Sequence, residues 1–182
     1  MPPSLVLVEG LTELRYFEAF FVAALGDVPR IAAVGEADPR VAVQRLRRDP
    51  ETPPEAAWLI WDVDPQAGQV RARQLRQAVR TAETLGARVG LCNPCFEFWL
   101  WLHVAKLPDG TPPLPAETWL RRCANALPGY RKAAPFTPAW VRDHVGHALS
   151  QSTAQAPSAD ALYGRAATSL PELLEPLFPA KR

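Results

Sequence analysis

The sequence predicts an α/β fold: a mostly parallel, four-stranded sheet flanked by helices and followed by a C-terminal helical extension. Through the first hundred residues, short apolar runs alternate with segments of helical periodicity, as in chains that form parallel sheets. Hydrophobic residues make up 48% of the 182 residues, which is enough for a buried core. We therefore expect a core over residues 1–105, with residues 106–182 packed on it.

The first two strands are short. Residues 5–8 are apolar, as in a buried strand, and a turn follows them. Thr12 is of the type that caps helices, and apolar residues at helical spacing come after it. Residues 29–34 read as a second strand, and the helix behind it is expected to stop before Pro50.

The third strand is the clearest. Residues 58–61 form an unbroken apolar run, which is expected where helices cover both faces of a sheet. An amphipathic helix over 69–85 leads to a fourth strand over 88–92, and a very apolar helix over 95–104 follows. Beyond Lys106, proline-rich or polar connectors separate shorter helical pieces. These pieces lie near residues 116–126, 138–149 and 170–178.

Carboxylates follow three of the predicted strands. Glu9 closes the first strand, Asp62 and Asp64 close the third, and Glu97 lies one turn into the helix after the fourth. Ligands of open parallel sheets bind outside the carboxyl ends of the strands, and alternation should project both aspartates to one side. Gathered carboxylates repel one another and need a proton or a cation. Oxygen ligands favour Mg²⁺ or Mn²⁺, so these four residues form a candidate metal site.

Three blocks of the sequence together resemble the RloB-like family, which includes the abortive-infection protein AbiLii. They are residues 8–17 (VEGLTELRYF), 61–64 (WDVD) and 93–103 (NPCFEFWLWLH). The resemblance implies a TOPRIM-like, Rossmann-like catalytic core. It also implies a Mg²⁺- or Mn²⁺-dependent nuclease of DNA or RNA that acts in bacterial defence against phage. Such proteins are often encoded beside an ABC- or SMC-like ATPase, which is the expected partner.

The resemblance also assigns roles to individual residues. Glu9 would be the general acid/base or a metal ligand, and Asp62 and Asp64 would bind the metal. Residues 130–132 resemble a Tyr-x-Lys segment of the family, so Lys132 would contact the phosphate in the transition state. The block after the fourth strand would supply three supporting residues, Asn93, Glu97 and His103. Cys92, where the family leads us to expect serine, and residues 151–170 depart from the family pattern.

Net charge gives no global attraction to nucleic acid. Lys and Arg total 20 against 19 for Asp and Glu, a net charge of +1, so any polyanion site must be a local patch. Four arginines are candidates for contacts with a nucleic-acid backbone: Arg73, Arg76, Arg80 and Arg131. A solvated helix face explains the first three equally well.

The cysteines offer alternative chemistry. Cys92 and Cys95 form a C-x-x-C at a strand-to-helix junction, where a redox pair could lie. With His144 and His147 they could also form a zinc site, although the two histidines are spaced more closely than is usual. We favour a third interpretation over both, in which the cysteines are buried and inert.

The chain is expected to be cytoplasmic. An odd number of cysteines, three, does not predict a disulfide framework, and no segment resembles a signal peptide or a membrane span. Trp119 and Trp140 are candidates for a partner surface, and a homo-oligomer is possible. The alternative function is a non-catalytic binding or regulatory subunit of an ABC- or SMC-like ATPase defence complex. The near-neutral charge and the extension motivate it.

Overall fold

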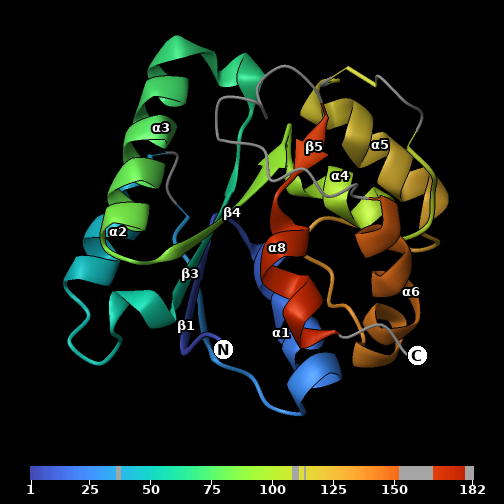
Figure 1. The fold of residues 1–182 in the computed structure, drawn as a ribbon. Helices are drawn as coiled ribbons and strands as arrows, with labels where there is room; N and C mark the ends of the chain where they lie inside the picture. The colour runs from blue at the N-terminus through green and yellow to red at the C-terminus, as the bar shows by residue number, and fades with distance from the viewer. Residues whose placement is uncertain (36–37, 108–110, 113, 152–165, 179–182) are drawn as a thin grey trace.

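A five-stranded, mostly parallel sheet is the centre of the fold (Figure 1). The computed structural model describes residues 1–35, 38–107, 111–112, 114–151 and 166–178. Its strand order is β2-β1-β3-β4-β5, and only the β4–β5 pair is antiparallel. The strands are β1 (Leu5–Val8), β2 (Arg30–Ala33), β3 (Ala57–Asp62), β4 (Arg88–Asn93) and β5 (Ala167–Thr168). The α/β prediction is confirmed, but the sheet has a fifth strand that the sequence did not predict.

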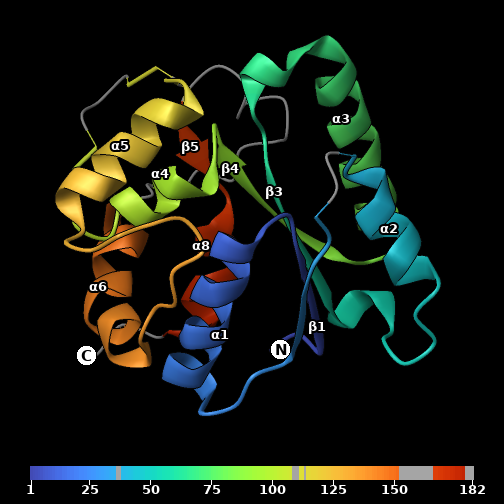
Figure 2. The same ribbon diagram turned by 180° about the vertical axis from the view of Figure 1, so that it is seen from behind.

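Helices cover both faces of the sheet (Figures 1 and 2). On one face lie α2 (Arg40–Arg47) and α3 (Gly68–Thr84). On the other lie α1 (Leu11–Leu25), α4 (Phe96–Trp101), α5 (Ala116–Ala126), α6 (Pro138–Gln151) and α8 (Leu170–Leu174). Short 3₁₀ turns occupy Pro54–Ala56, Pro65–Ala67 and Glu175–Leu177. Along β1, Val6 and Val8 enter one apolar cluster while Leu5 and Leu7 enter the other, as strand alternation requires.

The C-terminal helices share their buried residues with the first half of the chain. Cys123 of α5 and Val145 of α6 lie in one apolar cluster with α1 and α4. Trp119 is fully buried there, so the expectation that it serves a partner surface is wrong. Trp140 is only half-buried. Among the residues described, no helix combines the length and the apolar character needed to cross a bilayer.

The N-terminus of α1 differs from the sequence prediction. The helix begins at Leu11, and its capping position is Gly10, which has no side chain to cap with. Thr12 is therefore not the N-cap. Its Oγ1 instead accepts a hydrogen bond of 3.1 Å from the backbone N–H of Ala133, which joins α1 to the segment between α5 and α6.

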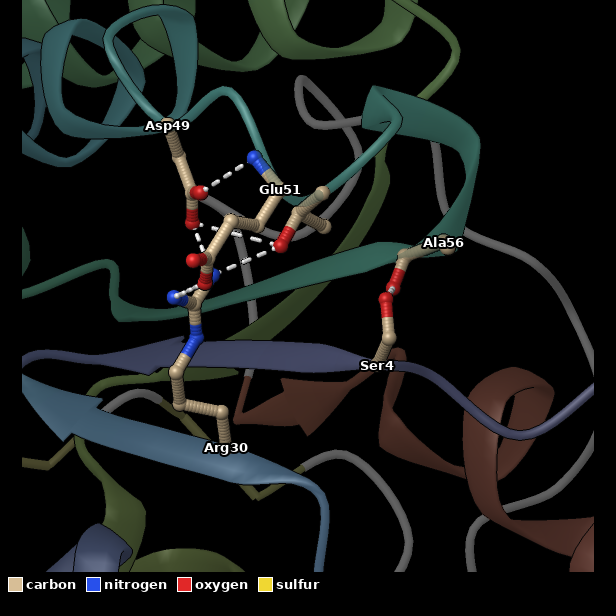
Figure 3. Close-up of polar contacts among 6 residues, drawn as sticks. Ser4, Arg30, Asp49, Glu51 and Ala56 are labelled. Atoms are coloured by element: carbon tan, nitrogen blue, oxygen red, sulfur yellow. Dashed lines mark hydrogen bonds and ion pairs between the residues drawn. The ribbon is translucent and has the colours of Figure 1, made fainter.

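Ion pairs and hydrogen bonds connect neighbouring segments at the amino ends of the strands. Arg30, which opens β2, donates to Glu51 at 3.0 Å and to Thr52 at 2.7 Å, and it also pairs with Asp49 (Figure 3). Ser4, just before β1, donates to the carbonyl oxygen of Ala56. These contacts fix the edge strand and the connection into β3 at the end of the sheet opposite the carboxylates.

Candidate acidic active site

The candidate site lies at the carboxyl ends of the three neighbouring parallel strands β1, β3 and β4. Glu9 directly follows β1, Asp62 is the last residue of β3, and Asn93 is the last residue of β4. Strand register places Val8 beside Ile60 and Asp62 beside Cys92, so these ends meet at one edge of the sheet. The strand-end rule therefore placed Glu9 and Asp62 correctly.

Asp62 is at the centre of the charge distribution. Burial raises the pKa of its carboxyl well above the ordinary value, and the charges of Glu13, Glu9 and Glu97 raise this pKa further. The positive charge of Lys132 lowers the pKa of Asp62. The structure thus brings together three carboxylates predicted from the sequence, adds a fourth in Glu13, and places Lys132 within electrostatic range of them.

The carboxylates differ in their access to solvent. Glu9, Asp62 and Asp64 are half-buried, so an ion or a substrate from solvent could reach them. Glu13 and Glu97 are only 7% and 5% exposed and form an inner pair behind them. A ligand would therefore meet the outer three carboxylates, while the inner two add negative potential at Asp62.

Glu13 is a site residue that the sequence reasoning missed. It is the third residue of α1, and its Oε2 lies 2.9 Å from where a Cβ on Gly10 would stand, so it curls back over the helix N-terminus. Burial raises the pKa of Glu13 to about 7, and the charges of Glu97 and Glu9 contribute to this shift. The available signal was a glutamate in the first helical turn just after a strand end, where helix dipoles favour carboxylates.

Arg71 is the second residue that was missed. Its Nη2 donates to both carboxylate oxygens of Glu9, at 3.0 and 2.9 Å, and the backbone N–H of Asp62 donates to Glu9 Oε2 at 3.2 Å. Burial raises the pKa of Glu9, and Arg71 opposes this rise. Arg71 lies one turn before Leu75 on the buried face of α3, and an arginine in an apolar helical stripe is a signal for such a role.

Asp64 lies beyond the end of β3. Its φ of 39° is in the left-handed region, which aspartate tolerates better than most residues, and its N–H donates to the carbonyl oxygen of Pro94 at 2.9 Å. The alternation of strand side chains therefore does not set its direction, contrary to our expectation for an Asp-x-Asp pair. Asp64 still raises the pKa of Glu9 through its charge.

Glu97 is held by the C-terminal part of the chain. Its Oε1 accepts a hydrogen bond of 3.3 Å from the hydroxyl of Tyr130, and its backbone oxygen accepts one of 2.9 Å from the thiol of Cys123. Tyr130 opens the segment that carries Lys132 and is joined to Thr12 through Ala133. Residues after 106 thus complete the site around a core built by residues before it.

The supporting residues predicted at Asn93 and His103 are buried away from solvent. Asn93 is fully buried. His103 is buried too, where its Nε2 accepts from the Tyr16 hydroxyl and its Nδ1 donates to the Trp99 carbonyl oxygen, each at 2.9 Å. Burial lowers the pKa of His103 to about 3, so the ring is neutral and orients Tyr16.

The predicted arginines are not gathered at the acidic cluster. Arg73, Arg80 and Arg131 are exposed, whereas Arg76 is half-buried. Arg80 lies nine residues after Arg71 on the same helix, a distance of about 14 Å along the axis. Their contact with nucleic acid stays a prediction.

The cysteines are buried and free, as the favoured interpretation expects. Burial raises the thiol pKa of Cys92 and of Cys95 above the ordinary value, which disfavours a reactive thiolate. His144 and His147 each hydrogen-bond a backbone carbonyl through Nδ1. Within the described parts of the chain, no three His, Cys, Asp or Glu side chains are grouped so that they could hold a metal ion by themselves.

Comparison with known proteins identifies the family. No curated protein and no solved structure matches the chain. A family model described as RloB-like protein matches residues 4–177, which include the strands, the acidic cluster and the C-terminal helices. The match thus spans nearly all of the sequence, and the chain belongs to the RloB-like family.

Proposed function

We propose that this protein is a TOPRIM-type nuclease that hydrolyses phosphodiester bonds of DNA or RNA with Mg²⁺ or Mn²⁺. The observation that carries the proposal is the position of Asp62. It lies at the carboxyl edge of a parallel sheet, with its pKa raised by burial and by the charges of Glu9, Glu13 and Glu97. Such a cluster is unfavourable without a proton or a cation, and a divalent cation relieves the repulsion directly.

The chemistry of the donors fits Mg²⁺ or Mn²⁺. The outer residues Glu9, Asp62 and Asp64 offer carboxylate oxygens alone, the hard ligands these ions prefer. Mg²⁺ is usually held by one or two carboxylates, several waters and the phosphates of the substrate. A site for it therefore does not need three protein ligands grouped in advance, and the described residues form no such group.

The residues of the chain divide the work as follows. Asp62 and Asp64 would hold the cation, which supplies Lewis-acid polarisation of a phosphate oxygen. Glu9, whose pKa is raised by burial, would transfer the proton as general acid/base while Arg71 holds its carboxylate in place. The positive charge of Lys132 lowers the pKa values of Asp62 and Glu13. Lys132 would contact the phosphate as negative charge develops on it in the transition state.

The biological role proposed here follows the family. Membership in the RloB-like family supports a role in bacterial defence against phage, in the cytoplasm, beside an ABC- or SMC-like ATPase. In that setting the ATPase would control access of the nuclease to nucleic acid.

A cleavage assay tests the proposed activity. Purified protein is incubated with supercoiled plasmid and with RNA, in Mg²⁺, in Mn²⁺ and in EDTA. We expect cleavage only with metal, and a loss of more than about a hundredfold in Asp62→Asn because several kcal/mol of charge stabilisation disappear. Asp143→Asn, a change at an exposed position of α6, is the matched control and should retain full activity.

The same protein preparation distinguishes the alternative function. If Asp62→Asn folds and cleaves as well as the parent, the metal assignment is wrong. If neither nucleic acid is cut and calorimetry detects no binding of Mg²⁺ or Mn²⁺, a non-catalytic role is favoured. Co-purification with an ATPase would then support a regulatory subunit.

A further inference from the structure

An aromatic cavity lies beside the acidic site. It has a volume of about 310 Å³ and is formed by residues 127–130, 134–137 and Trp140. The rings of Tyr130, Phe136 and Trp140 contribute to its walls, together with Pro128 and Pro135. Phe136 stands between the other two rings, with centroids 6.5 Å from Tyr130 and 5.4 Å from Trp140.

Tyr130 belongs to both the cavity and the acidic site. Its ring lines the cavity, and its hydroxyl donates to Glu97 Oε1 at 3.3 Å. The same segment is anchored to α1 by the hydrogen bond from the Ala133 N–H to Thr12 Oγ1, and Thr12 precedes Glu13 in the helix. The side chain of Tyr130 therefore connects the wall of the cavity to the carboxylate of Glu97.

The charges next to the cavity favour an anionic ligand. Arg131 and Lys132 lie between the two stretches that line it, and both side chains are exposed. Lys132 also acts electrostatically on Asp62 and Glu13. A ligand that places a flat ring in the cavity and a phosphate on these cations would extend toward the acidic site.

We propose that this cavity, called here the base pocket, binds one unpaired nucleobase of the substrate, and that the nuclease therefore prefers single-stranded nucleic acid. The proposal rests on the nuclease function proposed above and deepens it. The volume is near the lower end for ligand pockets, about 300 Å³, so it suits one ring system and excludes a duplex. Every base presents a face that stacks on aromatic side chains, and stacking tolerates different sequences.

An apolar side chain from a protein partner is the competing occupant. It would fill the cavity but would gain nothing from Arg131 and Lys132, or from the adjacent acidic site. A nucleotide uses all three features, because each base is joined to a phosphate that needs a positive contact. The arrangement of rings, cations and carboxylates therefore favours the nucleotide.

Binding measurements on the full chain carrying Asp62→Asn, which the proposed function expects to prevent cleavage, test this proposal. The probes are a single-stranded oligonucleotide with one 2-aminopurine, its fully paired duplex, and the same single strand with an abasic position. We expect tighter binding of the intact single strand than of either other probe, and quenching of 2-aminopurine by the stacked rings. Adding Phe136→Leu should weaken single-strand binding about fivefold or more, because the aromatic face is lost while an apolar side chain remains.

Phe178→Leu is the matched control. Phe178 is also a half-buried phenylalanine packed on the core, where it contacts Phe20, and it does not line the base pocket. This variant should bind like the parent. Trp140→Leu provides a second removal of an aromatic wall, and thermal unfolding shows which variants are folded.

Three results would contradict the proposed base pocket. They are equal affinity for the single strand and the duplex, an absence of 2-aminopurine quenching, and unchanged binding in a folded Phe136→Leu variant. If the Asp62→Asn parent did not bind the single strand, the proposal would be wrong and an apolar side chain of a protein partner would be the favoured occupant. Failure of the nuclease function would give a different result. In that case the wild-type chain would show quenching that depends on Phe136 but no metal-dependent cleavage.

Discussion

Arg71 directs a single guanidinium nitrogen at both carboxylate oxygens of Glu9, at 3.0 and 2.9 Å. Its side chain is only 10% exposed, and its other terminal nitrogen, Nη1, is buried without a hydrogen-bond partner among the described residues. This pairing opposes the rise in the pKa of Glu9 that burial causes. A buried arginine in this position orients the carboxylate of Glu9 and favours its charged form.

Replacing Arg71 with methionine should move the titration of Glu9. Removal of the cation leaves burial and Asp64, which raise the Glu9 pKa, opposed by the hydrogen bond from the Asp62 backbone, so this pKa rises. The limb of the pH profile for cleavage kcat/KM that reports Glu9 should therefore shift to higher pH.

Arg73→Met is the control for the loss of Arg71. It removes the same charge from the exposed face of the same helix and should leave the pH profile where it is. Arg71→Lys should give a smaller shift than Arg71→Met, since it returns a positive charge without the planar fork. A folded Arg71→Met protein with the parental pH profile would show that the pair has no influence on the reacting acid.

Glu13 makes stability depend on pH in the absence of divalent cations. Its pKa of about 7 in the folded protein exceeds the ordinary value of 4.5, so the folded chain binds more protons between these values. The stabilisation is complete below about pH 4.5 and is lost as pH rises through 7. Denaturant titrations in EDTA should therefore give a lower free energy of unfolding at pH 8 than at pH 5.5.

Glu13→Gln should flatten that dependence. A neutral amide has no proton to lose, so we expect the variant to exceed the parent in stability at pH 8 by about 3 kcal/mol, the scale of a pKa shift from 4.5 to about 7. Glu83→Gln, at an exposed position of α3, should leave the difference between the two pH values unchanged. Equal pH dependence in Glu13→Gln and the parent would show that other groups account for it.

Most of the sheet could be predicted because its strands carry continuous apolar runs. Residues 58–61 lie between two helical layers, and that double burial is visible in the sequence. The fifth strand has no such pattern. It consists of two residues held partly by side chains, with Thr168 donating to the Leu91 carbonyl oxygen at 2.8 Å and Ser169 accepting from the Leu91 N–H at 2.9 Å. Polar residues with these roles resemble a loop in sequence.

The site was predictable to the extent that strand ends determine it. Glu9 and Asp62 follow directly from the position where a parallel strand stops. Glu13 and Arg71 do not, because each lies within a helix, and only tertiary packing brings it toward Glu9. Tyr130 reaches Glu97 across 33 residues of sequence, a contact for which no local pattern exists. The carboxylates at the strand ends can be recognised from local sequence, whereas the residues that shift their pKa values or hold them in place are brought there by tertiary packing.

Lys132 should affect metal binding and catalysis in opposite directions. Its positive charge opposes the negative charges on Asp62 and Glu13, so Lys132→Met should bind Mg²⁺ as tightly as the parent or a few-fold more tightly. The same variant should cleave about tenfold or more slowly, because a phosphate contact in the transition state is lost. Calorimetry and single-turnover cleavage measure the two effects separately.

Lys106→Met removes the same charge from an exposed position outside the acidic cluster and should change neither quantity. If Lys132→Met weakened Mg²⁺ binding and cleavage together, the lysine would support the metal site rather than contact the phosphate. If it changed neither, the role implied for this residue by the family resemblance would be wrong.

Gly90 tests the packing of the C-terminal helix on the sheet. A Cβ at this position of β4 would lie 2.7 Å from Leu170 Cδ2, 2.8 Å from Ile60 Cδ1 and 3.0 Å from Leu173 Cδ1. Because these contacts are too close, Gly90→Ala should destabilise the protein by about 1–3 kcal/mol in denaturant titrations. Gly146→Ala is the matched control. It lies in α6 with nothing within 4 Å of its Cβ, and it should stabilise the protein by about 0.5–1 kcal/mol.

A double-mutant cycle locates the strain at Gly90. Leu170→Ala removes the branch nearest to the new methyl group, so Gly90→Ala should cost less in that background than in the parent. Additive losses would mean that α8 does not pack against β4 as closely as these distances require. A combined loss smaller than the sum of the two single losses would instead show that residues 170–174 pack on the strand that ends in Asn93, and so connect the C-terminal segment to the edge of the sheet where the carboxylates lie.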